Sequence, residues 1–169
     1  TQKNDLGNLS SIHPYSTGKY MIIDSSTRRN LELVETLREK QKRGSLLWVL
    51  DKTKTAMGAR TLRAYVEQPL IDKDEIELRQ EAIAELNDHV ITREELREYL
   101  NPIYDLERLI TRVTYRTANP RDLIAFKNSI SMLPPIKSLL DEFDGSLLKN
   151  IQNDIDAMEE LCSLVDHSI

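Results

Sequence analysis

Apolar residues recur at spacings of three and four along most of the chain from residue 25 onward, a pattern typical of helices that bury one face. The whole chain of 169 residues contains only five glycines, which also favours helices. The pattern predicts an all-α fold, an irregular multi-helix bundle with at most a minor short β element near residues 20–35. The strand candidate is "YMIID" at residues 20–24. Helices are predicted at residues 25–31, 45–51, 55–67, 73–88, 92–100, 104–116, 119–132, 134–143 and 146–169.

Helix-start and helix-stop residues support several of these boundaries. Asn119 is a good N-cap, and Pro120 follows it at the first helical position, where a missing N–H costs nothing. Asp105 is expected to cap the helix that follows it in the same way. The Pro134-Pro135 pair removes two backbone donors, so the helical pattern of residues 119–143 is expected to break or kink there.

The segment 146–169 has the most regular apolar spacing in the chain. The spacing predicts one helix, and no glycine or proline ends it before the sequence stops. Over three heptads, a coiled-coil seam and the ordinary core stripe of a bundle helix follow the same pattern, so both interpretations stay open. The stripe consists of Leu148, Ile151, Ile155, Met158, Cys162, Val165 and Ile169.

Gly58 lies inside a predicted helix, where glycine costs roughly 1 kcal/mol relative to alanine. At 100° per residue Gly58 falls on the apolar face, together with Leu62 and Tyr65, while Arg60 falls on the opposite face. We therefore expect close packing at Gly58, with another part of the backbone unusually near.

Trp48 is surrounded in sequence by aliphatic residues, in the segment "LLWVL". A short helix that is apolar nearly all round is expected to be covered on several sides. Stacking on a nucleic-acid base is the alternative, but aromatic residues that stack on bases usually stand among Lys and Arg. We therefore predict that Trp48 belongs to the core.

Composition favours a single domain that needs no disulfide. The chain is 40% hydrophobic, has one cysteine, Cys162, and contains no apolar run approaching the roughly 18 residues that cross a membrane. No signal peptide opens the sequence, so a cytoplasmic protein is expected, with no membrane partner. The missing initiator methionine suggests a piece of something longer.

Charge is unevenly distributed along the chain. The whole chain carries −5, and residues 141–169 hold eight acidic residues and one lysine, a net charge of −7. An acidic end repels a phosphate backbone, so we expect the chain alone to bind DNA weakly at best. Residues 28–43 are the one basic stretch, and a solvated surface explains them adequately.

The sequence contains no convincing catalytic, cofactor-binding or metal-binding pattern. "STGKY" at residues 16–20 lacks the first glycine and the Ser or Thr of a phosphate-binding loop. His13, His89 and His167 are far apart, and none has a His or Cys at helical spacing. Asp105 and Arg108 stand three residues apart, where a surface ion pair is expected.

Four segments in order carry a family resemblance: "YMIIDSSTRRNLEL", "GSLLWVLDKTKTAMGARTLRAYVEQPLID", "YDLERLITRV" and "ANPRDLIAFKNSISMLPPI". Together they resemble the core, or lever, domain of the bacterial MutS family of DNA mismatch recognition proteins, over residues 20–169. Residues 1–19 resemble a linker or the tail of the preceding connector domain. The motif positions include Asp24, Thr27, Arg28, Asn30, Thr55, Met57, Gly58, Arg60 and Leu62, with Asp105 and Arg108 in the third segment.

The resemblance implies a function. In that family this domain is a non-catalytic lever between mismatch-binding, clamp and ATPase domains, and here it would be cut just before the clamp. The parent would be a homodimeric, DNA-dependent ATPase that uses ATP and Mg²⁺ and binds mismatched duplex DNA. The alternative is a freestanding helical scaffold that binds a protein partner through the stripe at 148–169.

Overall fold

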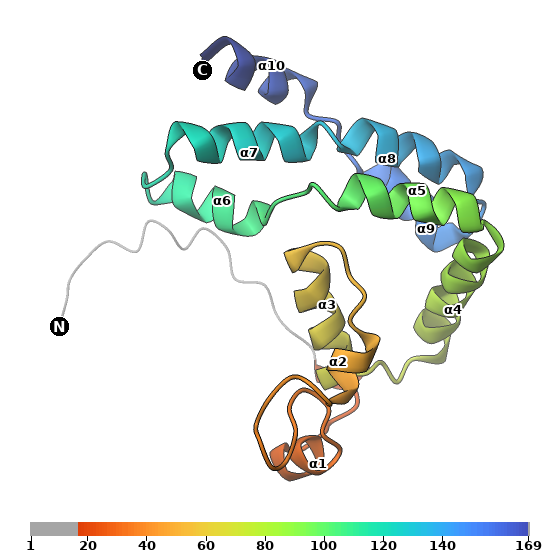
Figure 1. Cartoon of the computed structure of the whole chain (residues 1–169). Helices are drawn as coiled ribbons and strands as arrows, with labels where there is room; N and C mark the ends of the chain where they lie inside the picture. The colour runs from red at the N-terminus through yellow and green to blue at the C-terminus, as the bar shows by residue number, and fades with distance from the viewer. Residues whose placement is uncertain (1–16, 169) are drawn as a thin grey trace.

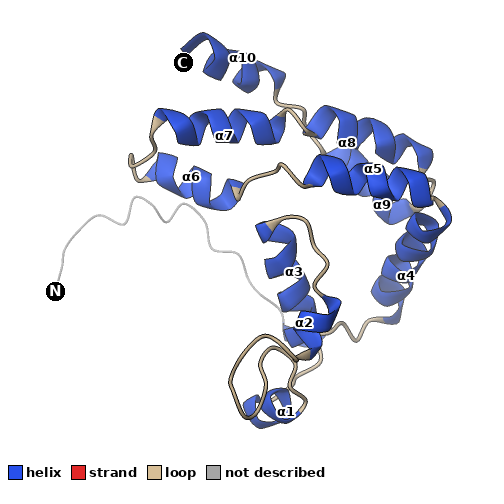
Figure 2. Cartoon of the chain, in the orientation of Figure 1, coloured by secondary structure: helices blue, strands red, loops and turns tan. Residues whose placement is uncertain are grey.

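The computed structural model describes residues 17–168 (Figure 1). This part of the chain consists of helices and loops without a named strand (Figure 2). Its β pairing is limited to an isolated antiparallel bridge between Tyr20 and Leu70. The all-α prediction is confirmed. The strand candidate at 20–24 is reduced to this bridge. The Met21 N–H donates to the Pro69 carbonyl at 2.8 Å, but the Asp24 carbonyl already accepts the Arg28 N–H at the start of α1. The predicted linker at residues 1–19 lies outside the described residues except for its last turn.

Most of the predicted helices occur within two residues of their expected bounds. The elements are η1 (Thr17–Lys19), α1 (Ser25–Asn30), α2 (Leu46–Leu50), α3 (Ala56–Glu67), α4 (Lys73–Asp88), α5 (Val90–Leu100), α6 (Leu106–Thr114), α7 (Pro120–Ile130), α8 (Leu133–Leu139), η2 (Leu140–Glu142), α9 (Ser146–Asp154) and α10 (Glu159–Ser168).

The capping predictions are confirmed at both sites. Asn119 and Asp122 form a reciprocal capping box at the start of α7, with Pro120 in the first turn. Asp105 accepts the Arg108 N–H at the start of α6. The predicted break before Pro134 also occurs, since α7 ends at Ile130 and α8 begins at Leu133.

We call the elements α4 to α10 the bundle (residues 73–168). Within it, α4, α5, α8, η2 and α9 surround an apolar core. Phe143 at its centre has no solvent exposure, and the His89 ring packs against it in a T-shaped arrangement with ring centroids 5.2 Å apart. Burial of such side chains is the main favourable term in folding. The core cluster comprises Ala82, Leu96, Ile136, Leu140, Phe143 and Leu148.

The first turn of α9 is capped from another helix. Gly145, at its N-cap, has no capping side chain, and the Glu85 carboxylate of α4 accepts the Gly145 N–H at 3.0 Å. A Cβ on Gly145 would overlap this carboxylate, so the glycine leaves room for it. Glu85 thereby fixes α9 against α4.

The prediction of one helix over 146–169 is wrong, because α9 and α10 are separate. Met158 between them has φ of 50°, a left-handed conformation that no α-helix continues. The Lys137 ammonium donates to the Ile155 carbonyl at 2.7 Å, and Asp156 accepts the Met158 N–H at 2.9 Å. These side chains bind the backbone groups that an unbroken helix would pair. The two halves then pack on different partners, α9 on α4 and α10 on α7.

The elements η1 to α3 form a second, smaller unit, which we call the first lobe (residues 17–71). Its α2 packs on α3, and within it Leu47 and Ser45 are buried. Trp48 is 47% exposed, so its assignment to the core is wrong. The reason is that α2 lies at the surface and, in the described part of the chain, only one of its sides is covered.

The two units lie next to each other, with α3 in the bend formed by α4, α5 and α6 (Figure 1). Only the short segment 68–72 connects them along the chain, between the end of α3 and the start of α4. Helix packing joins α2 with α3. Within the bundle it joins α4, α5, α8, η2 and α9 with one another, and it joins α6 and α10 with α7. Among the described helices, none of the first lobe packs extensively on the bundle.

Candidate functional site

Side chains suited to binding a metal ion do not gather in the described residues. No three His, Cys, Asp or Glu side chains there lie close enough to hold a metal ion. His89 and His167 instead contact backbone carbonyls of their own helices, at 2.9 and 2.7 Å. His13 lies outside the described residues. No described helix is long and apolar enough to span a bilayer.

The first motif of the sequence forms the start of α1. Asp24 is the N-cap: one carboxylate oxygen accepts the Thr27 N–H at 2.8 Å and the other accepts the Thr27 hydroxyl at 2.9 Å. These bonds, the backbone one first, lower the pKa of the Asp24 carboxyl below its ordinary value. Asn30 is the exposed last residue of α1. The motif is therefore a capping device in which Asp24 and Thr27 fix each other.

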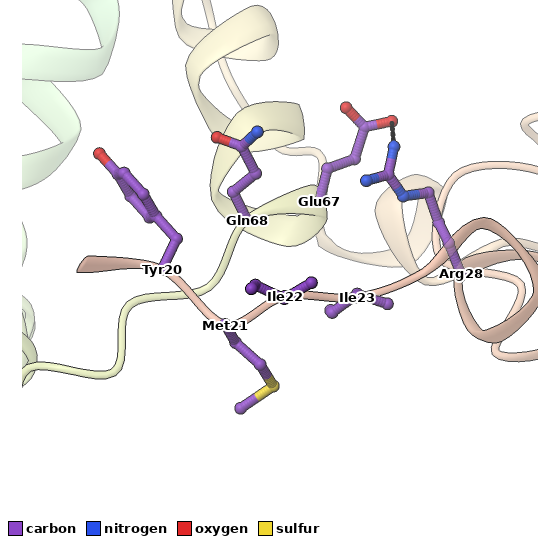
Figure 3. A pocket seen from close by; sticks show the side chains of 7 residues that line it. All are labelled: Tyr20, Met21, Ile22, Ile23, Arg28, Glu67 and Gln68. Carbon is purple, nitrogen blue, oxygen red and sulfur yellow. Dashed lines mark ion pairs between the residues drawn. The ribbon is translucent and has the colours of Figure 1, made fainter. Parts of the chain in front are cut away.

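Arg28 of the same motif connects α1 to the end of α3. Figure 3 shows its side chain reaching toward Glu67, and the guanidinium Nη1 lies 3.7 Å from that carboxylate. Between them and residues 20–23 lies a pocket of about 190 Å³. The Nε atom of Arg28 is shielded from solvent and has no hydrogen-bond partner. This contact holds the lobe together but leaves one polar group unsatisfied.

The second motif begins α3, and it corrects the expectation for Gly58. The Thr55 hydroxyl is the N-cap and accepts the Gly58 N–H at 3.0 Å. A Cβ on Gly58 would lie 3.0 Å from that hydroxyl and 3.5 Å from the Cβ of Thr53. The expected approach of another backbone element is therefore wrong: the glycine faces its own cap.

Arg60 joins the second motif to the third across the gap between the units. Its guanidinium makes two parallel hydrogen bonds to the Asp105 carboxylate, at 2.7 and 2.8 Å, and another to Glu107. Asp105 is held in place because it also caps α6 and pairs with the Arg108 Nε at 3.2 Å. The predicted Asp105–Arg108 ion pair is thus confirmed, as part of a larger cluster.

The charges of this cluster support one another. Hydrogen bonds from Arg60, first, and the Arg108 backbone lower the pKa of the Asp105 carboxyl, against the opposing effect of desolvation. Hydrogen bonds to Asp105, first, and to Glu107 raise the pKa of the Arg60 guanidinium. A bidentate pair of a planar guanidinium with a carboxylate is more specific than a single contact. The structure therefore brings together two motif residues that the sequence separates.

Two further contacts cross between the units, and no sequence pattern predicts either of them. The Arg79 guanidinium of α4 lies 3.8 Å from the centre of the Tyr65 ring of α3, a cation–π contact. The Lys19 ammonium pairs with Glu75 at 2.8 Å. Neither pair has a regular sequence spacing, and only the tertiary fold reveals them. Tyr65, predicted to pack, is half-exposed beneath Arg79, while Leu62 is half-buried.

An apolar cavity of about 360 Å³ separates the start of α3 from the bundle. The first lobe contributes Thr55 and Met57, and the bundle contributes aliphatic side chains such as Leu96, Leu100 and Leu106. Thr55 is the only polar residue in the lining. Near the Arg60 contact, the two units therefore face each other across an apolar space that side chains fill only in part.

Comparison with known proteins identifies the family. The family model described as MutS domain III matches residues 26–169. Over its whole length the chain is 68% identical to the DNA mismatch repair protein MutS of Lachnoclostridium phytofermentans, and it covers 18% of that protein. It is 50% identical to the proteins of the same name from Ruminiclostridium cellulolyticum and Clostridium novyi, covering 19% of each.

The chain thus spans about a fifth of the length of these relatives. The match to the family model and the sequence identities are both closer than they would need to be for proteins that share only a fold. The resemblance drawn from the four sequence segments is therefore confirmed: the chain belongs to the MutS family of DNA mismatch repair proteins, of which it represents domain III.

Proposed function

We propose that this chain is a mechanical connection inside a mismatch repair ATPase, transmitting movement between the domains that contact DNA and the domain that binds ATP. The observation that carries the proposal is its division into two units. One short segment and a few charged contacts join the first lobe to the bundle. Packed units connected in this way can move as rigid bodies, as hinged domains do.

The partners follow from this role. The connector, clamp and ATPase domains of the same chain would contact the exposed apolar side chains of both units, for example Trp48 on α2 and Ile91 on α5. The parent protein, as a homodimer in the cytoplasm, would bind the mismatched duplex and use ATP and Mg²⁺. This chain would contribute no reacting group, and its acidic end favours no contact with DNA.

The alternative, a scaffold that binds its partner along residues 148–169, has less support. The chain breaks between α9 and α10, so the stripe does not form one continuous face. Leu148 is buried in the bundle core and Val165 is buried against its neighbours, while Leu164 is 62% exposed. A partner would have to bind each half separately.

Added flexibility between the units tests the proposal. The 169 residues replace their equivalent in the Lachnoclostridium phytofermentans relative, and a Gly-Ser-Gly-Ser insertion is placed after Ile71. ATP-triggered release from a mismatched duplex should slow by roughly 5-fold or more, the lower end of typical coupling between sites. The control is the same insertion after Thr117, between α6 and α7. Parental release rates for both variants, with mismatch binding intact, would contradict the proposal.

A further inference from the structure

The contacts between the first lobe and the bundle differ in kind from the contacts within each unit. Within the bundle, aliphatic and aromatic side chains interlock around Phe143. Across the gap, the described contacts include one bidentate ion pair with an added carboxylate, one single ion pair and one cation–π contact. Charged contacts at a surface are weak and sensitive to salt, so the junction can open without unfolding either unit.

Arg60 is the contact best placed to control this junction. It lies near the start of α3, beside the cavity, whereas Lys19 and Arg79 bind Glu75 and Tyr65 closer to the connecting segment. The Arg60 side chain is 41% exposed and Asp105 is 17% exposed. Dissolved ions can therefore reach the pair, although the capping role of Asp105 keeps that carboxylate in position.

We propose that Arg60, Asp105 and Glu107 form an electrostatic latch that holds the first lobe closed over the apolar cavity. When salt screens the latch, the lobe turns about residues 71–72 and exposes the cavity. The inference concerns this chain alone and stands independently of any role in transmitting movement within a longer protein.

The response to salt separates this latch from simple apolar closure. Raising the salt concentration shortens the range of charge interactions, from a Debye length of about 30 Å at 0.01 M to about 3 Å at 1 M. Salt does not screen apolar contacts in this way, and strongly hydrated salts strengthen them. A junction held by Arg60 therefore opens as salt is added, while one held by the cavity lining stays closed.

The separation of the two units can be followed by fluorescence energy transfer. Trp48, its single tryptophan, is exposed on α2 of the first lobe, and Cys162, its single cysteine, lies on α10 of the bundle. A dansyl acceptor is attached in the Cys162→Ser, Glu159→Cys chain, because Glu159 is exposed at the start of α10. Energy transfer from Trp48 then reports the separation of the two units.

We expect transfer in this labelled chain to fall between about 0.01 M and about 1 M NaCl, the range over which charge screening changes most. Arg60→Ala should give low transfer at both concentrations, and Arg60→Lys an intermediate value, because Lys keeps the charge but loses the two-pronged geometry. The matched control is Arg63→Ala: Arg63 is also exposed on α3, but its ion pair is with Glu67 of the same helix, at 3.4 Å. Arg63→Ala should show the same energy transfer as the parent at both salt concentrations.

A second variant covers the case in which Arg60→Ala does not fold. Asp105→Asn with Glu107→Gln removes both negative charges, yet asparagine can still cap α6. It should show the same low, salt-independent transfer, together with increased binding of an apolar dye to the opened cavity. Transfer that does not change with salt in the parent, or variants that match Arg63→Ala, would overturn the latch.

Discussion

The first lobe and the bundle are both helical, but they maintain their structure by different means. The bundle buries a contiguous cluster around Phe143. In the first lobe, Leu33 and Leu47 are the buried apolar side chains, and exposed ones such as Trp48 surround them. Caps and backbone hydrogen bonds supply much of the remaining order, for example the Leu47 N–H on the Leu33 carbonyl at 2.8 Å.

This difference indicates which unit keeps its own shape and which unit depends on its surroundings. A unit with a closed core keeps its shape when its surroundings change, because its packing energy is internal. The first lobe has little internal packing, so its position depends on charged contacts such as Arg60 with Asp105. It also depends on whatever covers its apolar surface in a longer protein. Under the proposed function, the core of the bundle would be the rigid arm and the first lobe would be the adjustable end.

The strongest test of this contrast removes one aromatic side chain from each unit. Phe143→Ala should lower the free energy of unfolding by about 3–5 kcal/mol, because it leaves a cavity in the core. Trp48→Ala should cost less than about 1 kcal/mol, because nearly half of its surface is already exposed. Urea unfolding followed by circular dichroism measures both, since the second variant has no tryptophan fluorescence. Equal losses in the two variants would mean that the first lobe has a core of its own.

Sequence alone predicted the features that depend on neighbouring residues. The caps at Asn119 and Asp105 and the break before Pro134 follow from local hydrogen bonding, and the structure has all three. The break at Met158 was missed because the apolar spacing runs through it, and only the different partners of α9 and α10 impose it. Trp48 was misplaced because whether a short apolar helix is covered depends on the rest of the fold.

The motif residues show the same limit. Arg60 was placed on the polar face of its helix, and it is indeed exposed there. Its partner Asp105 is 45 positions away, and no periodic pattern connects the two. Asp105 was assigned only a cap and a local pair with Arg108. The family resemblance includes both residues, but their hydrogen bonds can be found only in the three-dimensional structure.

A second prediction tests whether caps stabilise the first lobe as strongly as proposed. Thr55→Ala removes the α3 cap and should cost about 1 kcal/mol. Gly58→Ala in the parent should lose stability slightly or leave it unchanged, because its Cβ would press on the Thr55 hydroxyl at 3.0 Å. In the Thr55→Ala background the same change should add up to about 1 kcal/mol through helix propensity.

This double-mutant cycle has a clear opposite outcome. If Gly58→Ala has the same effect on stability in both backgrounds, Gly58 is not energetically coupled to the Thr55 cap, and other neighbours determine its packing. Thermal unfolding of the four chains by circular dichroism gives the comparison. A large gain in stability from Gly58→Ala in the parent would likewise show that the Thr55 hydroxyl can move aside at little cost.

The smallest expected effect is a pH dependence that belongs to the first lobe. Hydrogen bonds from Lys42, first, and Thr53 lower the pKa of Asp51 from 3.8 to about 2. A lowered folded-state pKa stabilises the protein above the unfolded value, and this contribution is lost as the pH falls from about 4 toward 2. Asp51→Asn should therefore flatten the fall in thermal midpoint over that window. Lys42→Met should flatten it too, because it removes the main cause of the lowered pKa. Thermal scans between pH 2 and 5 measure it, and a parental slope in both variants would mean that other carboxylates with a lowered pKa, such as Asp24 and Asp105, account for the loss of stability in acid.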